Sequence, residues 1–261
     1  MASLNDKVKH FIVRAGHTAP CPVNDHTSSV YSYLLEGKEK ALLIDTGLGQ
    51  IDLLETVRGL TNKPVEAICT HAHFDHIGAN PFFEKVWINE LDREAYKLHT
   101  TDFRAVFPYY SYADVRDNIE WYDGEPEFDL GERHIKVILT PGHTLGHIAL
   151  LDREHRWLFT GDSCCKEAVL LNLPHTTSVE TYRRSIAKLL DMRDLYDITW
   201  PAHHTLPVGT DVLEQFLTAC DDLLSQKVTA DDRETPFGPT CIYPYKDISI
   251  HYKKNGLFDA T

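Results

Sequence analysis

The chain of 261 residues is long enough for one large domain or two small ones, and its 43% hydrophobic content is ordinary for a folded globular protein. Its formal net charge of -13 argues against a nucleic-acid-binding surface. No apolar run is long enough to cross a bilayer, the amino terminus lacks a signal-peptide core, and the six cysteines form no Cys-x-x-Cys pair, so we expect a cytoplasmic protein with reduced thiols and no membrane association.

The first part of the chain alternates between strand and helix patterns. Apolar or alternating runs predict strands at 10–14, 28–35, 41–44, 65–69 and 86–88. Residues 41–44 are apolar throughout, as expected of a strand that is covered on both faces. Apolar residues at helical spacing predict helices at 51–60 and 89–98, the second capped by Asn89. This alternation predicts a layered α/β domain.

Four metal-competent side chains follow the 65–69 strand within six residues. They form the sequence His71-x-His73-x-Asp75-His76. In extended backbone His71 and His73 point the same way, whereas Asp75 and His76 come after a turn and can face a second point. Crowding these groups together is electrostatically costly without a cation, and imidazole and carboxylate are ligands for zinc, iron and manganese. One short loop is therefore predicted to serve two adjacent metals.

The second part of the chain carries more strands and two long helices. The expected strands are 133–139, 148–151, 157–159, 197–200 and, as an edge strand, 247–252. The expected helices are 178–190, capped by Ser178, and 211–226. Residues 99–129 are rich in aromatic side chains, which either wall a substrate pocket or form a small core under a long connection. We expect one domain over 1–261, with an aromatic-rich insertion at 99–129 and a C-terminal helix plus tail at 210–261.

Polar, metal-competent residues end four of the apolar strands. These residues are His71, His143, Asp162 and His203. Strand ends at one edge of a sheet are a natural place to gather a site, so the repetition favours a shared centre. Asp45 ends the 41–44 strand in the same way. It either orients a ligand histidine or satisfies the amides of its own turn.

The motifs together resemble the metallo-β-lactamase superfamily of dinuclear hydrolases, from Asp45 to about His203. The matching motifs are the histidine motif at 70–78, Pro141-Gly142-His143-Thr144, Gly161-Asp162 and Pro201-Ala202-His203. The resemblance implies an α/β fold of the αββα type, a sandwich of two mixed β-sheets flanked by helices, with the metals at one sheet edge.

The resemblance also implies a ligand set. His71, His73 and His143 would hold one metal, Asp75, His76 and His203 would hold the second, and Asp162 would bridge both. His203 fits the last motif better than its neighbour His204. Two zinc ions are favoured, although iron and manganese accept the same ligands.

The activity expected from this resemblance is hydrolysis by a hydroxide that bridges the two metals, with Asp75 and Asp162 as the catalytic carboxylates. The stretch 141–147 is similar to that in glyoxalase II-like thioesterases and acyl-homoserine lactonases, so a small ester, thioester or lactone is the expected substrate. Cys165 stands where such lactonases carry Tyr. Open alternatives are a β-lactam or phosphodiester hydrolase, a mononuclear iron oxygenase and a non-catalytic, metal-stabilised binding protein. The aromatic segment at 99–129 could also form a homodimer contact.

Overall fold

Two mixed β-sheets and a smaller third sheet organise the chain, for which a computed structural model describes residues 10–17, 29–49, 51–102, 117–235 and 238–260. The first sheet has the strand order β1 (His10–His17), β2 (Ser29–Glu36), β3 (Ala41–Ile44), β4 (Val65–Ile68), β5 (Val86–Asn89) and β6 (Ile119–Tyr122). Its first three strands are antiparallel and the rest are parallel. Helices α1 (Leu53–Leu60) and α3 (Arg93–Lys97) pack against its outer face.

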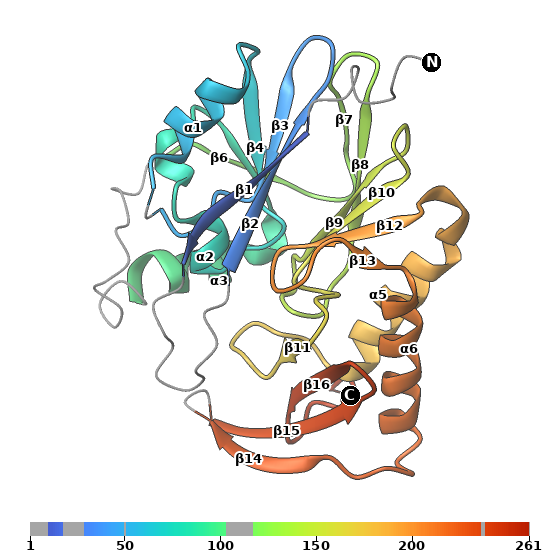
Figure 1. The fold of residues 1–261 in the computed structure, drawn as a ribbon. Coiled ribbons are helices and arrows are strands. Elements are labelled where there is room, and N and C mark those ends of the chain that lie inside the picture. Colours follow the sequence, from blue (N-terminus) through green and yellow to red (C-terminus); the bar gives the residue numbers. More distant parts are fainter. Residues whose placement is uncertain (1–9, 18–28, 50, 103–116, 236–237, 261) are drawn as a thin grey trace.

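The second sheet also has six strands. Their order is β13 (Val208–Gly209), β12 (Ile198–Pro201), β10 (Trp157–Gly161), β9 (Ile148–Asp152), β8 (His134–Leu139) and β7 (Glu127–Asp129). Helices α5 (Val179–Asp191) and α6 (Asp211–Leu224) cover its outer face (Figure 1). The Ser178 side chain accepts a hydrogen bond from the amide of Thr181, which confirms the predicted N-cap of α5.

A buried apolar layer joins the inner faces of the two large sheets. Leu42 and Ile44 of β3 contribute to this layer together with Val137, Leu150 and Phe159 of the second sheet. The other face of β3 packs toward α1, so all four of its residues are buried, as the apolar run predicted. The order helix, sheet, sheet, helix confirms the expected αββα sandwich.

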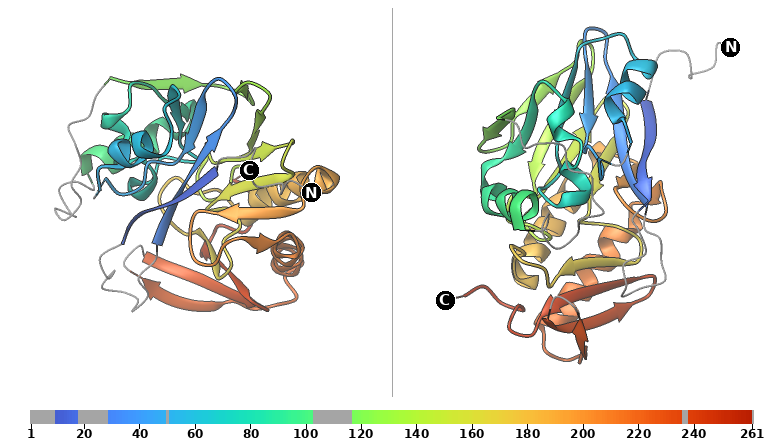
Figure 2. Two further views of the ribbon diagram at one scale, coloured as in Figure 1. Left: turned by 45° about the horizontal axis from the view of Figure 1, so that its top comes forward. Right: turned by 90° about the vertical axis from the view of Figure 1, so that its left-hand side faces the viewer.

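The sequence predicted neither a third, four-stranded sheet nor the edge strands β6, β7 and β13 of the two large sheets. The order of the third sheet is β11 (Ala168–Leu171), β16 (Ile248–Lys253), β15 (Gly238–Tyr245) and β14 (Asp231–Thr235). Both views of Figure 2 place it at one end of the sandwich. The expectation of an edge strand at 247–252 was wrong, because β16 lies between β11 and β15. The stretch after α6 is thus a hairpin-based sheet.

The segment from Asn89 onward departs from its predicted single helix. Asn89 caps a short 3₁₀ helix by accepting a hydrogen bond from the Leu91 amide at 3.1 Å, and α3 follows it. This 3₁₀ helix spans Glu90–Asp92. The other short helices are α2 (Phe74–Ile77), the 3₁₀ helices Asn80–Phe82 and Arg193–Leu195, and the π-helical turn Leu98–Asp102. Within the described ranges, no helix has the length and apolar character needed to cross a membrane.

The aromatic segment expected at 99–129 is only partly described, since 103–116 lie outside the described residues. Trp121 and Tyr122 belong to β6 and Phe128 belongs to β7. Tyr122 and Phe128 are buried in the layer between the sheets, and Trp121 packs edge-on against Tyr96. These three side chains fit the small-core interpretation, and a pocket wall or dimer contact formed by the aromatic residues between 103 and 116 stays a prediction.

Candidate metal centre

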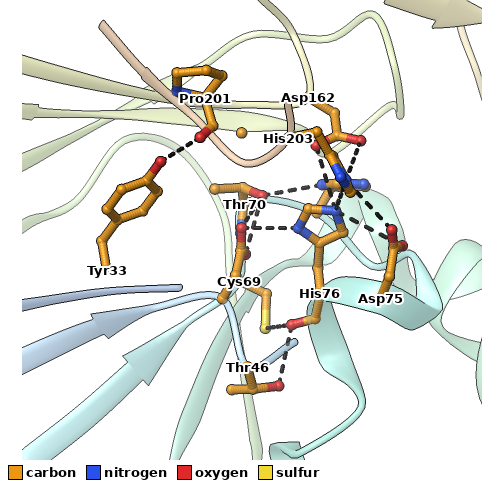
Figure 3. Close-up of polar contacts among 12 residues, drawn as sticks. Tyr33, Thr46, Cys69, Thr70, Asp75, His76, Asp162, Pro201 and His203 are labelled. Carbon is orange, nitrogen blue, oxygen red and sulfur yellow. Dashed lines mark hydrogen bonds and ion pairs between the residues drawn. The ribbon is translucent and has the colours of Figure 1, made fainter. Parts of the chain in front are cut away.

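Loops at the carboxyl ends of four strands meet at one edge of the sandwich. The loop after β4 carries the histidine motif, and the ends of β8, β10 and β12 lead to His143, Asp162 and His203. Strands β8, β10 and β12 run in the same direction, which is why their ends converge. Strand β2 of the first sheet joins the second sheet here, because Tyr31 N donates to Ala202 O at 3.0 Å. The Tyr33 hydroxyl likewise donates to Pro201 O (Figure 3).

The first cluster consists of three imidazoles. One ring nitrogen from each of His71, His73 and His143 lies within 4.8 Å of the other two. The three Nε2 atoms are buried and lack a hydrogen-bond partner among the described residues. Nδ1 of His143 donates to Leu170 O at 2.8 Å, so the Nε2 atom of the neutral ring carries no proton and its lone pair is available to a metal. Burial lowers the pKa of all three rings, so each is neutral and able to bind a cation.

The second cluster combines one carboxylate with two imidazoles, Asp75, His76 and His203, and these point toward one another in Figure 3. His203 Nε2 lies 3.4 Å from Asp75 Oδ2 and 3.3 Å from His76 Nε2. Burial alone would lower the pKa of His203, but the Asp162 and Asp75 carboxylates outweigh burial and raise it to about 10. The carboxylates therefore draw positive charge into the cluster, and a metal ion would supply it.

Asp162 lies between the two clusters. Its Oδ2 is 3.4 Å from His143 Nε2 of the first cluster and 3.3 Å from His203 Nε2 of the second, and its Oδ1 is 3.4 Å from His76 Nε2. Burial alone would raise the pKa of Asp162, but His203 and His76 outweigh burial and hold it well below the usual range. The buried imidazole nitrogens, to which no described residue is hydrogen-bonded, and this ionised carboxylate fit two divalent cations that would share Asp162 as a ligand.

Of the two roles that the sequence left open for Asp45, the contacts of its side chain fit the orienting one. Its carboxylate is buried and accepts hydrogen bonds from the Thr70 amide at 2.6 Å and from His76 Nδ1 at 2.9 Å. The Thr70 hydroxyl also contacts it at 2.9 Å and lies 3.1 Å from His71 Nδ1. Asp45 has φ +60°, the left-handed turn conformation that aspartate tolerates better than most residues. The carboxylate thus ties its own turn to the distant histidine loop and orients His76 directly, with Thr70 as its link to His71.

Two further histidines lie beside the centre in different roles. His147 Nε2 accepts a hydrogen bond from the Asp162 amide at 3.2 Å, and its Nδ1 is 3.0 Å from Thr140 Oγ1. Burial lowers the pKa of His147 to about 3, so the ring is a neutral support for the turn at Asp162. His204 Nδ1 pairs with Glu167 at 3.2 Å, and His204 belongs to neither cluster, whereas His203 does.

Sequence reasoning missed the Leu170 carbonyl and the Asp92 carboxylate, both of which contact the loops that carry the first cluster. Every residue has a backbone carbonyl, so the type of residue at position 170 does not indicate that its carbonyl contacts His143. Asp92 falls within the predicted helix at 89–98, where a carboxylate usually faces solvent, so no local signal distinguished it.

The comparisons with known proteins agree with this geometry. The sequence profile of the Metallo-beta-lactamase superfamily matches residues 27–198, a span that contains six of the seven predicted ligands. The chain is 29% identical over 203 residues to the "Acyl-coenzyme A thioesterase MBLAC2" of Gallus gallus, covering 67% of this chain and 72% of that protein. The Homo sapiens protein of the same name is 27% identical over 203 residues, covering 66% and 71%.

The similarity extends to solved structures. A crystal structure of an archaeal metallo-beta-lactamase superfamily protein, ST1585 from Sulfolobus tokodaii, superposes with a TM-score of 0.60 at 22% identity. The superposition covers 85% of this chain and 88% of the archaeal chain. At 22% identity, the similarity to the archaeal structure is evidence for the fold alone.

Proposed function

The chain belongs to the metallo-β-lactamase superfamily, and from that premise we propose that it is a dizinc hydrolase of acyl thioesters. The observation that carries the proposal is the pair of ligand clusters joined by the Asp162 carboxylate. The choice of thioesters over the other small esters and lactones rests on the printed names of the chicken and human relatives. The second cluster argues against a mononuclear iron oxygenase, which would use the first cluster alone.

Each proposed ligand has a defined task. His71, His73 and His143 would hold one ion, Asp75, His76 and His203 the other, and Asp162 would contact both. Bound zinc ions would polarise the thioester carbonyl and lower the pKa of a shared water so that hydroxide is available at neutral pH.

The protein's own groups handle the proton that the attacking water gives up. Burial alone would raise the pKa of Asp75, but His76 and His203 outweigh burial and lower it, so this carboxylate is ionised at neutral pH. Its side chain keeps 15% of its surface exposed, which leaves it accessible to water at the edge of the sheet. Asp75 is therefore placed to accept the proton, as well as to hold metal.

We also propose a reducing compartment such as the cytoplasm as the place of action. The support for this is that the five cysteines within the described residues are free and buried.

The test is turnover of the zinc-loaded chain against a panel of an acyl-CoA thioester, a lactone, an aryl ester, a phosphodiester and a β-lactam. We expect the thioester to give the highest kcat/KM. Asp162→Ala should lower that value by about 1000-fold or more, equivalent to about 4 kcal/mol of transition-state stabilisation.

The matched control is Asp152→Asn, which alters another buried carboxylate at the opposite end of β9 from the site. It should keep full activity at a temperature where it is folded. Faster cleavage of another substrate class would contradict the thioester assignment, and full activity of Asp162→Ala would contradict the whole hydrolase mechanism.

A further inference from the structure

Asp92 is a fully buried carboxylate that contacts two loops distant from it in the sequence. Its Oδ2 accepts hydrogen bonds from the Ala72 amide at 2.9 Å and from the Thr144 hydroxyl at 2.8 Å. Its Oδ1 accepts a third from the Gly146 amide at 2.6 Å. Each of these three partners is a donor, so the side chain serves purely as an acceptor.

A local structural role does not account for these contacts. Asp92 occupies the N-cap position of α3, where aspartate commonly accepts a hydrogen bond from its own helix. Here its side chain makes no capping bond. The carboxylate instead turns away from its helix toward the loop after β4 and the loop after β8.

These two loops carry the three members of the first cluster. Ala72 lies between His71 and His73 in the chain, and Thr144 directly follows His143. We infer that Asp92 is a positioning residue that holds the His71–His73 loop and the His143 loop in register, so that their three imidazoles meet at one metal. The inference rests on the metal centre of the proposed function, but not on the identity of the substrate.

The close approach of Gly146 to Asp92 explains how this contact forms. A Cβ atom added at Gly146 would lie 2.8 Å from both the backbone nitrogen and Oδ1 of Asp92. Such distances are too short for a side chain, so the loop after His143 can reach the carboxylate because residue 146 is glycine. The contact therefore needs both residues: Asp92 provides the acceptor oxygen, and Gly146 leaves room for the loop to reach it.

Asp92→Asn is the direct test, because an asparagine keeps the shape but presents an amide NH₂ to one of the donors. The full-length chain is equilibrated at a series of buffered free Zn²⁺ concentrations, and bound zinc per chain is measured by elemental analysis. We expect the wild-type chain to bind two ions. In Asp92→Asn the affinity for one ion should fall roughly 10- to 100-fold, with little change for the other.

Three further variants make the result specific. In a His71→Ala background, which removes the first cluster, Asp92→Asn should have little additional effect on zinc binding. Thr144→Val, which removes one of the three donors, should weaken the same ion by a smaller factor than Asp92→Asn does. Asp152→Asn is the control for loss of a buried carboxylate, and it should leave both affinities unchanged. Circular dichroism confirms that each variant is folded during the titration.

The inference is overturned if Asp92→Asn binds both ions as tightly as the wild-type chain, if Asp152→Asn weakens zinc to the same extent, or if the wild-type chain binds no zinc. A selective loss supports it whether or not the chain cleaves thioesters. Failure of the proposed substrate is thus distinguishable from failure of the inference.

Discussion

Replacing Asp45 with asparagine keeps the shape of the side chain but turns one of its two acceptor atoms into a donor. The three groups around Asp45 all donate in the arrangement described above: the Thr70 amide to Oδ1, and the Thr70 hydroxyl and His76 Nδ1 to Oδ2. The new NH₂ group must therefore face at least one donor, whichever way the amide is turned.

The two orientations of the new side-chain amide have different consequences. If the NH₂ group faces His76, the proton on Nδ1 moves to Nε2, the atom that lies toward Asp75 and Asp162, and the second metal loses a ligand. If it faces the Thr70 amide, a buried backbone donor loses its acceptor and the fold is destabilised. In either orientation the variant lacks one hydrogen bond to the charged Asp45, which is worth about 1.5–3 kcal/mol, or roughly 10- to 100-fold in an equilibrium constant.

The assay therefore combines two measurements on the same variant: zinc affinity in buffered free Zn²⁺ and the free energy of unfolding of the zinc-free chain in urea. We expect the Asp45→Asn penalty to fall on one or both quantities, with a sum near the range above. Asp152→Asn is the control, since it should lower the free energy of unfolding alone. If Asp45→Asn changes neither quantity by more than about 0.5 kcal/mol, the hydrogen-bond argument for Asp45 is refuted.

Gly142→Ala places a Cβ atom 2.6 Å from Cδ2 of the buried Tyr182 ring, so we expect a loss of about 1–3 kcal/mol in urea unfolding. Gly59→Ala, in α1 with open space around the added Cβ, should instead be neutral or stabilising, and equal effects at the two glycines would contradict the steric argument. Asp152→Asn should lower the free energy of unfolding by about 3 kcal/mol at pH 7. Burial alone would raise the pKa of Asp152, but the neighbouring imidazole and guanidinium groups outweigh burial and lower it. Its ionised form thus stabilises the fold above its unfolded pKa of about 4, and this stability is lost as pH falls through the lower, folded pKa. If the difference in the free energy of unfolding between Asp152→Asn and the wild-type chain does not shrink as the pH is lowered, this direction of the pH dependence is contradicted.

The candidate site was predictable because its chemistry is concentrated in short stretches of sequence. His71, His73, Asp75 and His76 are nearly consecutive, and strand ends brought His143 beside them. The supports of the site were not predictable in the same way. The three partners of Asp92 lie 20, 52 and 54 residues away from it, and no local pattern records such distances.

Most strands of the two large sheets followed from apolar runs such as Ala41–Ile44, whereas the third sheet has little such signal. β14 reads Asp-Asp-Arg-Glu-Thr, a charged sequence that suggests a loop. β15 contains Pro239 and Pro244, which lack the amide that an interior strand normally donates. Pairing across the sheet and packing on α6 overrode these local preferences, and that information lies outside the segment itself.

The Leu170 carbonyl that orients His143 belongs to β11, an edge strand whose ladder partner is β16 (Figure 1). During synthesis the proposed ligands therefore leave the ribosome well before Ile248–Lys253, the strand that pairs with β11. A nascent or prematurely terminated chain that ends before β16 would carry the full set of ligands without the ladder that orients His143. Late assembly of this kind couples maturation of the candidate metal centre to the synthesis and pairing of β16.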